Sequence, residues 1–123
     1  MIFENRFQNR HAVITGGAAG LGHGIAQRII AEGGTVEAWD IDPNALSALN
    51  TPGLTPRQIY VTDAAAVASA MQAAQPDILV CSAGITGPNA TTWDYPIDDW
   101  LKVQDLNLNA IFYCFFDSFF YSW

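Results

Sequence analysis

Short apolar runs alternate with longer amphipathic segments along most of the chain. His11–Thr15 is an apolar run that ends in two glycines, which predicts a buried strand entering a tight turn. In Leu21–Glu32 isoleucines recur at helical spacing before a second pair of glycines, so we expect a helix that stops there. Thr35–Trp39 predicts a second strand, with Asp40 at its end. The chain is therefore expected to open with a strand, a helix and a strand.

The same alternation continues through the middle of the chain. Asp42 followed by Pro43 predicts the start of a second helix, because Asp is a preferred N-cap and Pro fits the first helical position. Gln58–Val61 predicts a third strand, Asp63 is placed to cap an alanine-rich helix, and Asp77–Cys81 predicts a fourth strand. The order β-α-β-α-β-α-β predicts an α/β fold with a doubly wound parallel sheet of the Rossmann type. In such a sheet the chain reverses direction between the first and the fourth strand.

The C-terminal part of the chain predicts a loop and one long helix. Gly84–Tyr95 is rich in turn residues, which indicates the loop. Apolar side chains then recur at helical spacing, at Ile97, Leu101, Leu108, Ile111, Phe115 and Phe119. Polar residues interrupt this segment, so no membrane span is expected. With no repeat and no second domain boundary, we expect residues 1–123 to form a single domain.

Composition narrows the classes of partner and compartment. Five Lys plus Arg against twelve Asp plus Glu give 123 residues a formal net charge of −7, which disfavours nucleic acid and anionic membrane surfaces. Cys81 and Cys114 lie far apart in sequence, with no CxxC spacing, so we expect two ordinary buried thiols, no disulfide framework and no metal site. Residues 1–10 are too polar for a secretory signal, so a cytoplasmic protein is expected.

A glycine-rich turn is predicted where the first strand meets the first helix. In the segment TGGAAGLG, residues 15–22, backbone N–H groups and the helix N-terminus converge, which predicts an anion site. Gly16, Gly20 and Gly22 are expected to allow positive φ, close approach of a pyrophosphate, and packing of the helix against the strand. Because the strict G-x-G-x-x-G spacing is absent, a turn with a purely structural role is the alternative.

An acidic residue at the end of the second strand indicates which ligand that turn would bind. Asp40 stands where a carboxylate binds the ribose 2′-hydroxyl of a dinucleotide, whereas the alternative is a solvated residue at a strand end. Asp40 would repel a 2′-phosphate, and neither Ala18, Ala19, Ile41 nor Asp42 offers a compensating cation. We therefore expect NAD to be preferred over NADP.

Ordered motifs along the chain resemble those of the short-chain dehydrogenase/reductase family, and the resemblance extends from about Arg10 to Cys114. The motifs are Thr15-Gly16-x-x-x-Gly20-x-Gly22, Asp40 after the second strand, Asp63 after the third, Ser82-Ala83-Gly84 after the fourth and Asn107-Leu108 in the long helix. The resemblance implies a dinucleotide-binding domain of an NAD-dependent oxidoreductase that moves hydride between the nicotinamide and a secondary alcohol or ketone.

The resemblance also implies roles for individual residues. The glycine turn, with Leu21, would hold the pyrophosphate, and Asp40, with Ile41, would select NAD. Asp63 would hydrogen-bond the adenine with help from Ala64, although Asp63 can equally be a helix cap or serve both purposes. Ala83 and Gly84 would line the cofactor, while Ser82 could contribute hydrogen bonds between strand ends or have no functional weight. Asn107 would join a proton relay by positioning a water near the catalytic lysine.

The chain departs from the family in its reaction chemistry. The family uses a Tyr as general acid/base, a Lys four residues later that lowers the tyrosine pKa, and a substrate-polarising Ser. Lys102 is the only lysine, and none of the four tyrosines is followed at that spacing by a lysine. We therefore expect an incomplete domain, without turnover on its own. The alternatives are a non-catalytic dinucleotide-binding module or sensor, and a remnant without function.

Residues 115–123 are unusually aromatic for the exposed end of a helix. One interpretation is a homo-oligomer interface, as the resemblance implies for the C-terminal helix. The other is a non-native ending of the chain. Both interpretations remain open from the sequence.

Overall fold

The computed structural model describes residues 1–120, and its centre is a parallel sheet of four strands. The strands are β1 (His11–Thr15), β2 (Thr35–Asp40), β3 (Leu54–Gln58) and β4 (Ile78–Cys81), in the spatial order β3-β2-β1-β4. This order confirms the predicted reversal between the first and the fourth strand. It also confirms a doubly wound fold of the Rossmann type.

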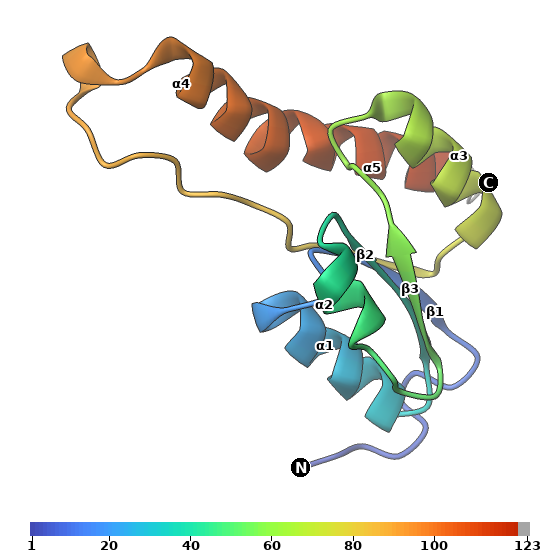
Figure 1. Cartoon of the computed structure of the whole chain (residues 1–123). Helices are drawn as coiled ribbons and strands as arrows, with labels where there is room; N and C mark the ends of the chain where they lie inside the picture. Colours follow the sequence, from blue (N-terminus) through green and yellow to red (C-terminus); the bar gives the residue numbers. More distant parts are fainter. Residues whose placement is uncertain (121–123) are drawn as a thin grey trace.

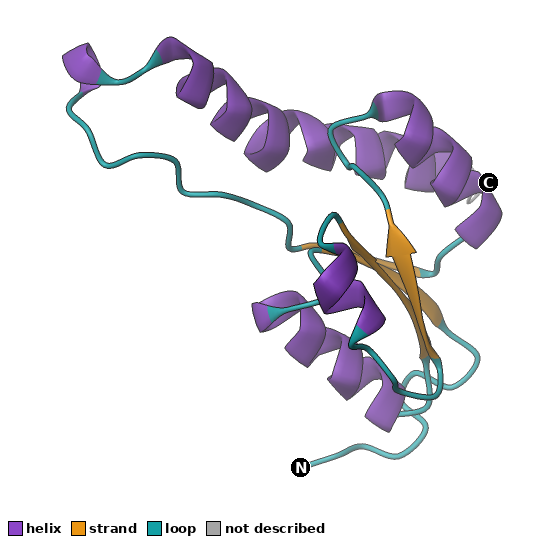
Figure 2. Cartoon of the chain, in the orientation of Figure 1, coloured by secondary structure: helices purple, strands orange, loops and turns teal. Residues whose placement is uncertain are grey.

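Helices cover both faces of the sheet (Figure 1). α1 (Gly20–Ala31) and α2 (Pro43–Ser47) lie on one face, and α3 (Ala64–Ala74) and α5 (Ala110–Phe120) lie on the other (Figure 2). Two buried clusters correspond to these two layers. The first contains Ala12, Ile14, Ala26, Ile29 and Val36, and the second contains Val13, Trp39, Val61, Val67, Ala70, Met71, Ala110 and Cys114. Alternate residues of β1 therefore face opposite layers, as the period of a strand requires.

Helix caps form where the sequence predicted them. The Asp42 carboxylate accepts hydrogen bonds from the N–H groups of Asn44 and Ala45, with Pro43 at the first position of α2. Asp63 accepts from the N–H of Ala66 at the start of α3. Both caps satisfy N–H groups that would otherwise lack a partner at the helix start.

The predicted position of the third strand is wrong. We expected Gln58–Val61, whereas β3 spans Leu54–Gln58 and ends where the apolar run begins. β3 is an edge strand, so Pro56 is tolerated and most of its side chains are polar or exposed. Arg57 pairs with the buried Glu37 of β2 at 3.2 Å. The apolar run instead carries the chain over the second cluster, where Val61 is buried.

The C-terminal helical segment is continuous but not uniform. After a short 3-10 turn, η1 (Thr92–Asp94), it consists of α4 (Ile97–Gln104), the π-helix η2 (Asp105–Asn109) and α5. α4 and the loop before it project away from the sheet, and α5 returns to pack beside α3 (Figure 1). Within residues 1–120, no helix has both the length and the apolarity needed to cross a membrane.

The buried side of α5 is not the side whose apolar spacing led us to predict the helix. Ala110, Cys114 and Asp117 are buried, whereas Phe115 and Phe119 are exposed. The predicted aromatic segment 115–123 lies only partly within the described residues, because 121–123 are outside them. Its assignment as an interface or a non-native ending therefore stays a prediction.

A buried carboxylate fastens the N-terminal segment to the end of α1. Glu32 is fully buried and accepts hydrogen bonds from the N–H of Phe3 (2.9 Å), from Arg6 (2.5 Å) and from Arg28 (2.9 Å). Burial by itself raises the pKa of Glu32, but the hydrogen bonds from Phe3, Arg28 and Arg6 outweigh it and lower the pKa from 4.5 to about 2. The folded protein therefore favours the ionised form.

This pKa shift predicts a specific loss of stability in acid. Because the pKa of Glu32 is lower in the folded chain, its ionisation stabilises the fold above about pH 4.5, and this contribution falls as the pH approaches about 2. We expect Glu32→Gln to lower the Tm at pH 7, and the difference from the unmodified chain to shrink between pH 5 and pH 3. Thermal melts followed by circular dichroism measure both quantities.

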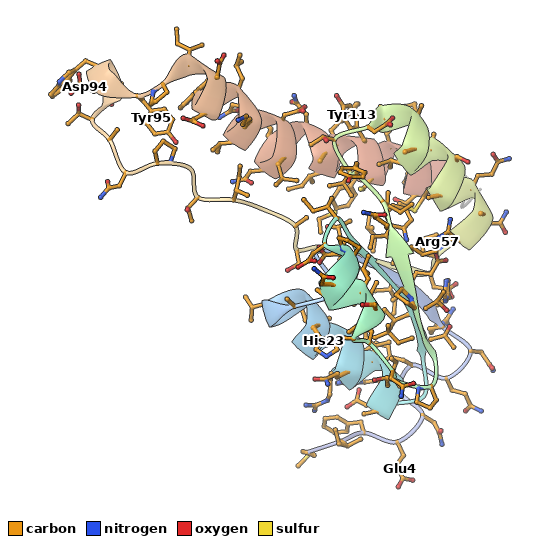
Figure 3. The ribbon with its side chains drawn as sticks, viewed as in Figure 1. Glu4, His23, Arg57, Asp94, Tyr95 and Tyr113 are labelled. Carbon is orange, nitrogen blue, oxygen red and sulfur yellow. The ribbon has the colours of Figure 1, made fainter. Side chains whose placement is uncertain are left out.

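Glu4→Gln is the matched control, since Glu4 lies in the same segment with its side chain exposed and directed away from the chain (Figure 3). It should leave the Tm nearly unchanged at every pH. A difference between Glu32→Gln and the unmodified chain that stays constant across this pH range would contradict the assignment.

Candidate functional site

A cleft of about 260 Å³ opens at the carboxyl ends of the strands. The pairing of the strands aligns these ends, because Thr15 lies opposite Trp39 of β2 and opposite Cys81 of β4. The cleft is lined by Gly16, Trp39, Asp40, Ile41, Ile59, Val61, Ser82, Ala83, Gly84, Ile85 and Leu106. It therefore lies at the reversal of strand order, where ligands of open α/β sheets bind.

Close backbone approach explains the glycines at positions 16 and 22 of the turn. Gly16 has φ +64°, and a Cβ there would lie 2.9 Å from the backbone nitrogen of Ala83. Gly20 also has a positive φ, of +57°. Gly22 does not, so that part of the prediction is wrong for Gly22; a Cβ there would instead collide with the carbonyl oxygen of Gly16. The turn therefore has no room for a side chain at Gly16 or Gly22, whereas Gly20 has open space around it and only its φ favours glycine.

Thr15 joins the end of β1 to the end of its neighbour β4. Its hydroxyl accepts hydrogen bonds from the N–H groups of Ser82 (3.1 Å) and Ala83 (3.2 Å), and its carbonyl accepts a second one from Ser82 (3.2 Å). Thr15 is buried beneath the cleft and does not line it. The tie therefore runs through the Thr15 hydroxyl and the backbone of Ser82, and it positions the Ser82–Gly84 wall.

The Asp40 carboxylate joins the end of β2 to the glycine turn. One oxygen accepts from the N–H of Ala18 (3.2 Å), and the other from Ile41 (2.8 Å) and Asp42 (3.2 Å). Of the ion pairs found among residues 1–120, none involves Asp40. Each carboxylate oxygen has several lone-pair directions, so the group can accept further hydrogen bonds from a ligand hydroxyl in the cleft.

The structure places the remaining predicted residues around the cleft but not in its lining. Gly20, Leu21 and Gly22 form the start of α1, directly after the turn. Asp63 and Ala64 stand exposed at the N-terminus of α3, while Val61 just before them does line the cleft. Contact of Asp63 or Ala64 with adenine therefore stays a prediction.

Asn107 does not line the cleft itself but holds Ile85, which forms its lip. Its amide nitrogen donates to the Ile85 carbonyl (2.8 Å), and its amide oxygen accepts from the Ile85 N–H (2.9 Å). The same oxygen would lie 3.2 Å from a Cβ added at Gly84. This two-point contact fixes the segment after β4, and a part in a proton relay stays a prediction.

Apolar residues of the lining were missed from the sequence. These are Trp39, Ile59, Val61, Ile85 and Leu106. Ile59 and Val61 follow β3, so the misplaced third strand concealed that they lie beyond a strand end. Correct placement of that strand would have identified both, because ligand contacts gather after the strand ends in this fold. No group of three or more metal-ligating side chains occurs in the part of the chain that the structure describes.

Comparison with known proteins gives a family match to "short chain dehydrogenase" over residues 10–118. The chain is 45% identical over 120 residues to the 2-dehydro-3-deoxy-L-rhamnonate dehydrogenase (NAD(+)) of Sphingomonas sp. (strain SKA58), covering 92% of this chain and 48% of that protein. It is 31% identical over 128 residues to human (3R)-3-hydroxyacyl-CoA dehydrogenase, covering 89% and 49%. The chain thus spans about half the length of the curated relatives it matches.

A solved structure gives the same result for the fold. The short-chain dehydrogenase/reductase of Brucella melitensis, described as a glucose/ribitol dehydrogenase, superposes with a TM-score of 0.86 at 28% identity, covering 97% of this chain and 54% of that one. The family match includes the cleft, the glycine turn and the asparagine at its lip. The chain belongs to the short-chain dehydrogenase/reductase family.

Proposed function

We propose that the chain is the dinucleotide-binding part of an NAD-dependent dehydrogenase that interconverts a secondary alcohol and a ketone. The observation that carries the proposal is the Asp40 carboxylate, bound to the N–H of Ala18 in the glycine turn and lining the same cleft as Gly16. NAD would supply the hydride acceptor when bound. The glycine turn would hold its pyrophosphate through backbone N–H groups and the N-terminus of α1.

A preference for NAD over NADP follows from the charge at Asp40. A carboxylate at this place can accept hydrogen bonds from ribose hydroxyls, and its negative charge opposes a 2′-phosphate. Ala18 and Ile41, which contact this carboxylate, carry no positive charge that would offset it. The relative with 45% identity is itself described as an NAD(+) enzyme, which supports the same preference.

The relatives suggest the substrate class of the whole protein. The relative with 45% identity acts on a deoxy sugar acid, and the human relative is described as acting on a hydroxyacyl thioester. Identity is higher for the first, so we propose a hydroxyl-bearing sugar acid as the substrate class. Residues 1–123 alone are proposed to lack turnover, because they contain no Tyr-x-x-x-Lys pair.

That missing pair also supports a second candidate, a non-catalytic module that binds NAD as a sensor or as a subunit of a larger assembly. The two candidates share the cofactor site and differ in reaction chemistry. Saturable NAD binding is required by both, and absence of binding would contradict both.

The choice of cofactor is tested at Asp40. We expect Asp40→Asn and Asp40→Ala to weaken NAD binding about ten- to hundredfold, the worth of hydrogen bonds to a charged group, and to weaken NADP binding much less. The decisive quantity is the ratio of the two Kd values from isothermal titration calorimetry. Both substitutions also remove the hydrogen bond from the Ala18 N–H, which loosens the turn and weakens the binding of NAD and NADP alike. The ratio of the two Kd values cancels this shared effect and reports the contact with the ribose.

Asp42→Asn is the control for charge alone. It removes a neighbouring negative charge and keeps a residue that caps α2 well. Its ratio of Kd values should change much less than that of the Asp40 variants. Equal weakening of NAD and NADP by Asp40→Asn would rule out the ribose contact.

The close packing of the turn is tested with two glycines of one helix. Gly22→Ala puts a methyl group against the carbonyl oxygen of Gly16, so we expect a lower Tm and loss of NAD binding. Gly24→Ala meets no atom within 4 Å and should raise stability by about 0.5–1 kcal/mol, the difference in helix propensity. Denaturant unfolding and calorimetry compare the two. Equal stabilities and unchanged binding would show that the approach to Gly16 is not needed.

Reaction chemistry is tested with the 123-residue polypeptide. We expect no NADH formation above the buffer rate with sugar acids, polyols, 3-hydroxyacyl thioesters or steroids, because no tyrosine–lysine pair is available as acid and base. Absorbance of NADH follows the reaction. Sustained NADH formation by the pure polypeptide would disprove the proposed lack of turnover.

A further inference from the structure

The two cysteines, far apart in sequence, meet behind the cleft. Cys81 is the last residue of β4, and Cys114 lies on the buried side of α5, which packs against β4. Both line one small cavity, and Val61, Ala83 and Leu106 line this cavity and the cleft alike. Both cysteines are free thiols, as expected, but only Cys114 is fully buried, and the pair shares a wall with the candidate cofactor site.

The two cysteines differ in exposure and in thiol pKa. Cys114 is 1% exposed, whereas Cys81 is only partly buried. The Cys114 side chain beside it lowers the pKa of the Cys81 thiol below its ordinary value, and burial opposes this shift. The neighbouring Cys81 side chain, burial and the negative charge of Asp117 raise the pKa of Cys114. The partly buried residue of the pair therefore has the lower thiol pKa, and its buried neighbour holds its proton more firmly.

We propose that Cys81 and Cys114 are a redox-active dithiol, a modification site at which hydrogen peroxide forms a disulfide between β4 and α5. The proposal goes beyond the NAD site and does not require NAD to bind. It uses the packing of Cys81 against the buried cluster that contains Cys114, the cavity that both residues line, and the partial exposure of Cys81.

The reaction consists of two balanced displacements. The Cys81 thiolate attacks one oxygen of hydrogen peroxide, an S–O bond forms, the O–O bond breaks, and the departing hydroxide takes up a proton as water. The Cys114 sulfur then attacks the Cys81 sulfenic acid, an S–S bond forms, the S–O bond breaks, and the second oxygen leaves with the Cys114 proton as water. Two thiols lose two electrons in total, and one peroxide becomes two waters.

The cavity favours the second step over further oxidation. Cys81 and Cys114 both line it and it has no room for a water molecule, so the Cys81 sulfenic acid forms beside the Cys114 thiol. Further oxidation would need another peroxide to reach the same sulfur. The disulfide should therefore form before the sulfinic acid, which cannot be reversed by thiols.

The test uses the full chain, reduced and then treated with hydrogen peroxide. Intact mass should fall by about 2 Da as two thiols become a disulfide, and both free thiols should disappear from a denatured thiol assay. Peptide mapping without reductant should yield a Cys81–Cys114 cross-linked peptide, which separates this result from oxidation of the exposed Met1 or the buried Met71. The Tm of the oxidised monomer should rise by roughly 10 °C and return after reduction, because a disulfide restricts the unfolded chain.

Two variants make the order of attack visible. In Cys114→Ala, a small apolar exchange in the core, peroxide should oxidise Cys81 to sulfenic and sulfinic acid, with a gain of mass in place of a loss. In Cys81→Ala the buried Cys114 should react at least about tenfold more slowly than Cys81 does in Cys114→Ala. The mass and peptide map of the unmodified chain require neither variant to fold.

Three outcomes would overturn the proposal. They are persistence of both thiols at peroxide doses that oxidise a free cysteine peptide, accumulation of sulfinic acid without a cross-linked peptide, and disulfides formed only between chains. Each is independent of NAD titrations, so failure here and failure of the cofactor site can be told apart.

Discussion

The rest of the structure depends on how closely the glycine turn passes the backbone that follows β4. A Cβ at Gly16 would lie 2.9 Å from the Ala83 nitrogen, and the Thr15 hydroxyl draws the N–H groups of Ser82 and Ala83 toward β1. This contact joins two strands whose connections leave in opposite directions, so the cleft opens directly above it. A larger side chain at Gly16 would separate the strand ends and remove the floor of the cleft.

Asp40 shows how one side chain can serve both the fold and the proposed ligand. Its contacts to the N–H groups of Ala18, Ile41 and Asp42 hold it at the mouth of the cleft before any ligand arrives. Restricting the carboxylate in this way lowers the entropy lost when a ligand binds, which is the general benefit of preorganisation. Because these contacts also hold the turn, removing the charge of Asp40 changes the shape of the site for both cofactors. Only a comparison of NAD with NADP isolates the contribution of the ribose contact.

Local patterns predicted the part of the molecule where sequence neighbours are also structural neighbours. β1 and the caps at Asp42 and Asp63 follow from a few adjacent residues each and formed as predicted. The glycine turn formed where it was expected, with positive φ at Gly16 and Gly20 but not at Gly22. β3 was misplaced because an edge strand needs only one partner and can be polar, so the apolar run after it attracted the prediction. The meeting of Cys81 and Cys114 at one cavity depends on how α5 packs on β4, which no local pattern encodes.

The π-helix in the C-terminal segment lets one helical segment meet two different requirements. Before it, α4 projects from the sheet with exposed Trp100 and Leu101; after it, the small residues Ala110 and Cys114 are buried toward the core. A π-turn adds a residue to the helix and so rotates the faces on either side relative to each other. Asn107 lies within this turn and holds Ile85 at the lip of the cleft. The irregular backbone therefore connects the packing of α5 behind the cleft to the position of its rim.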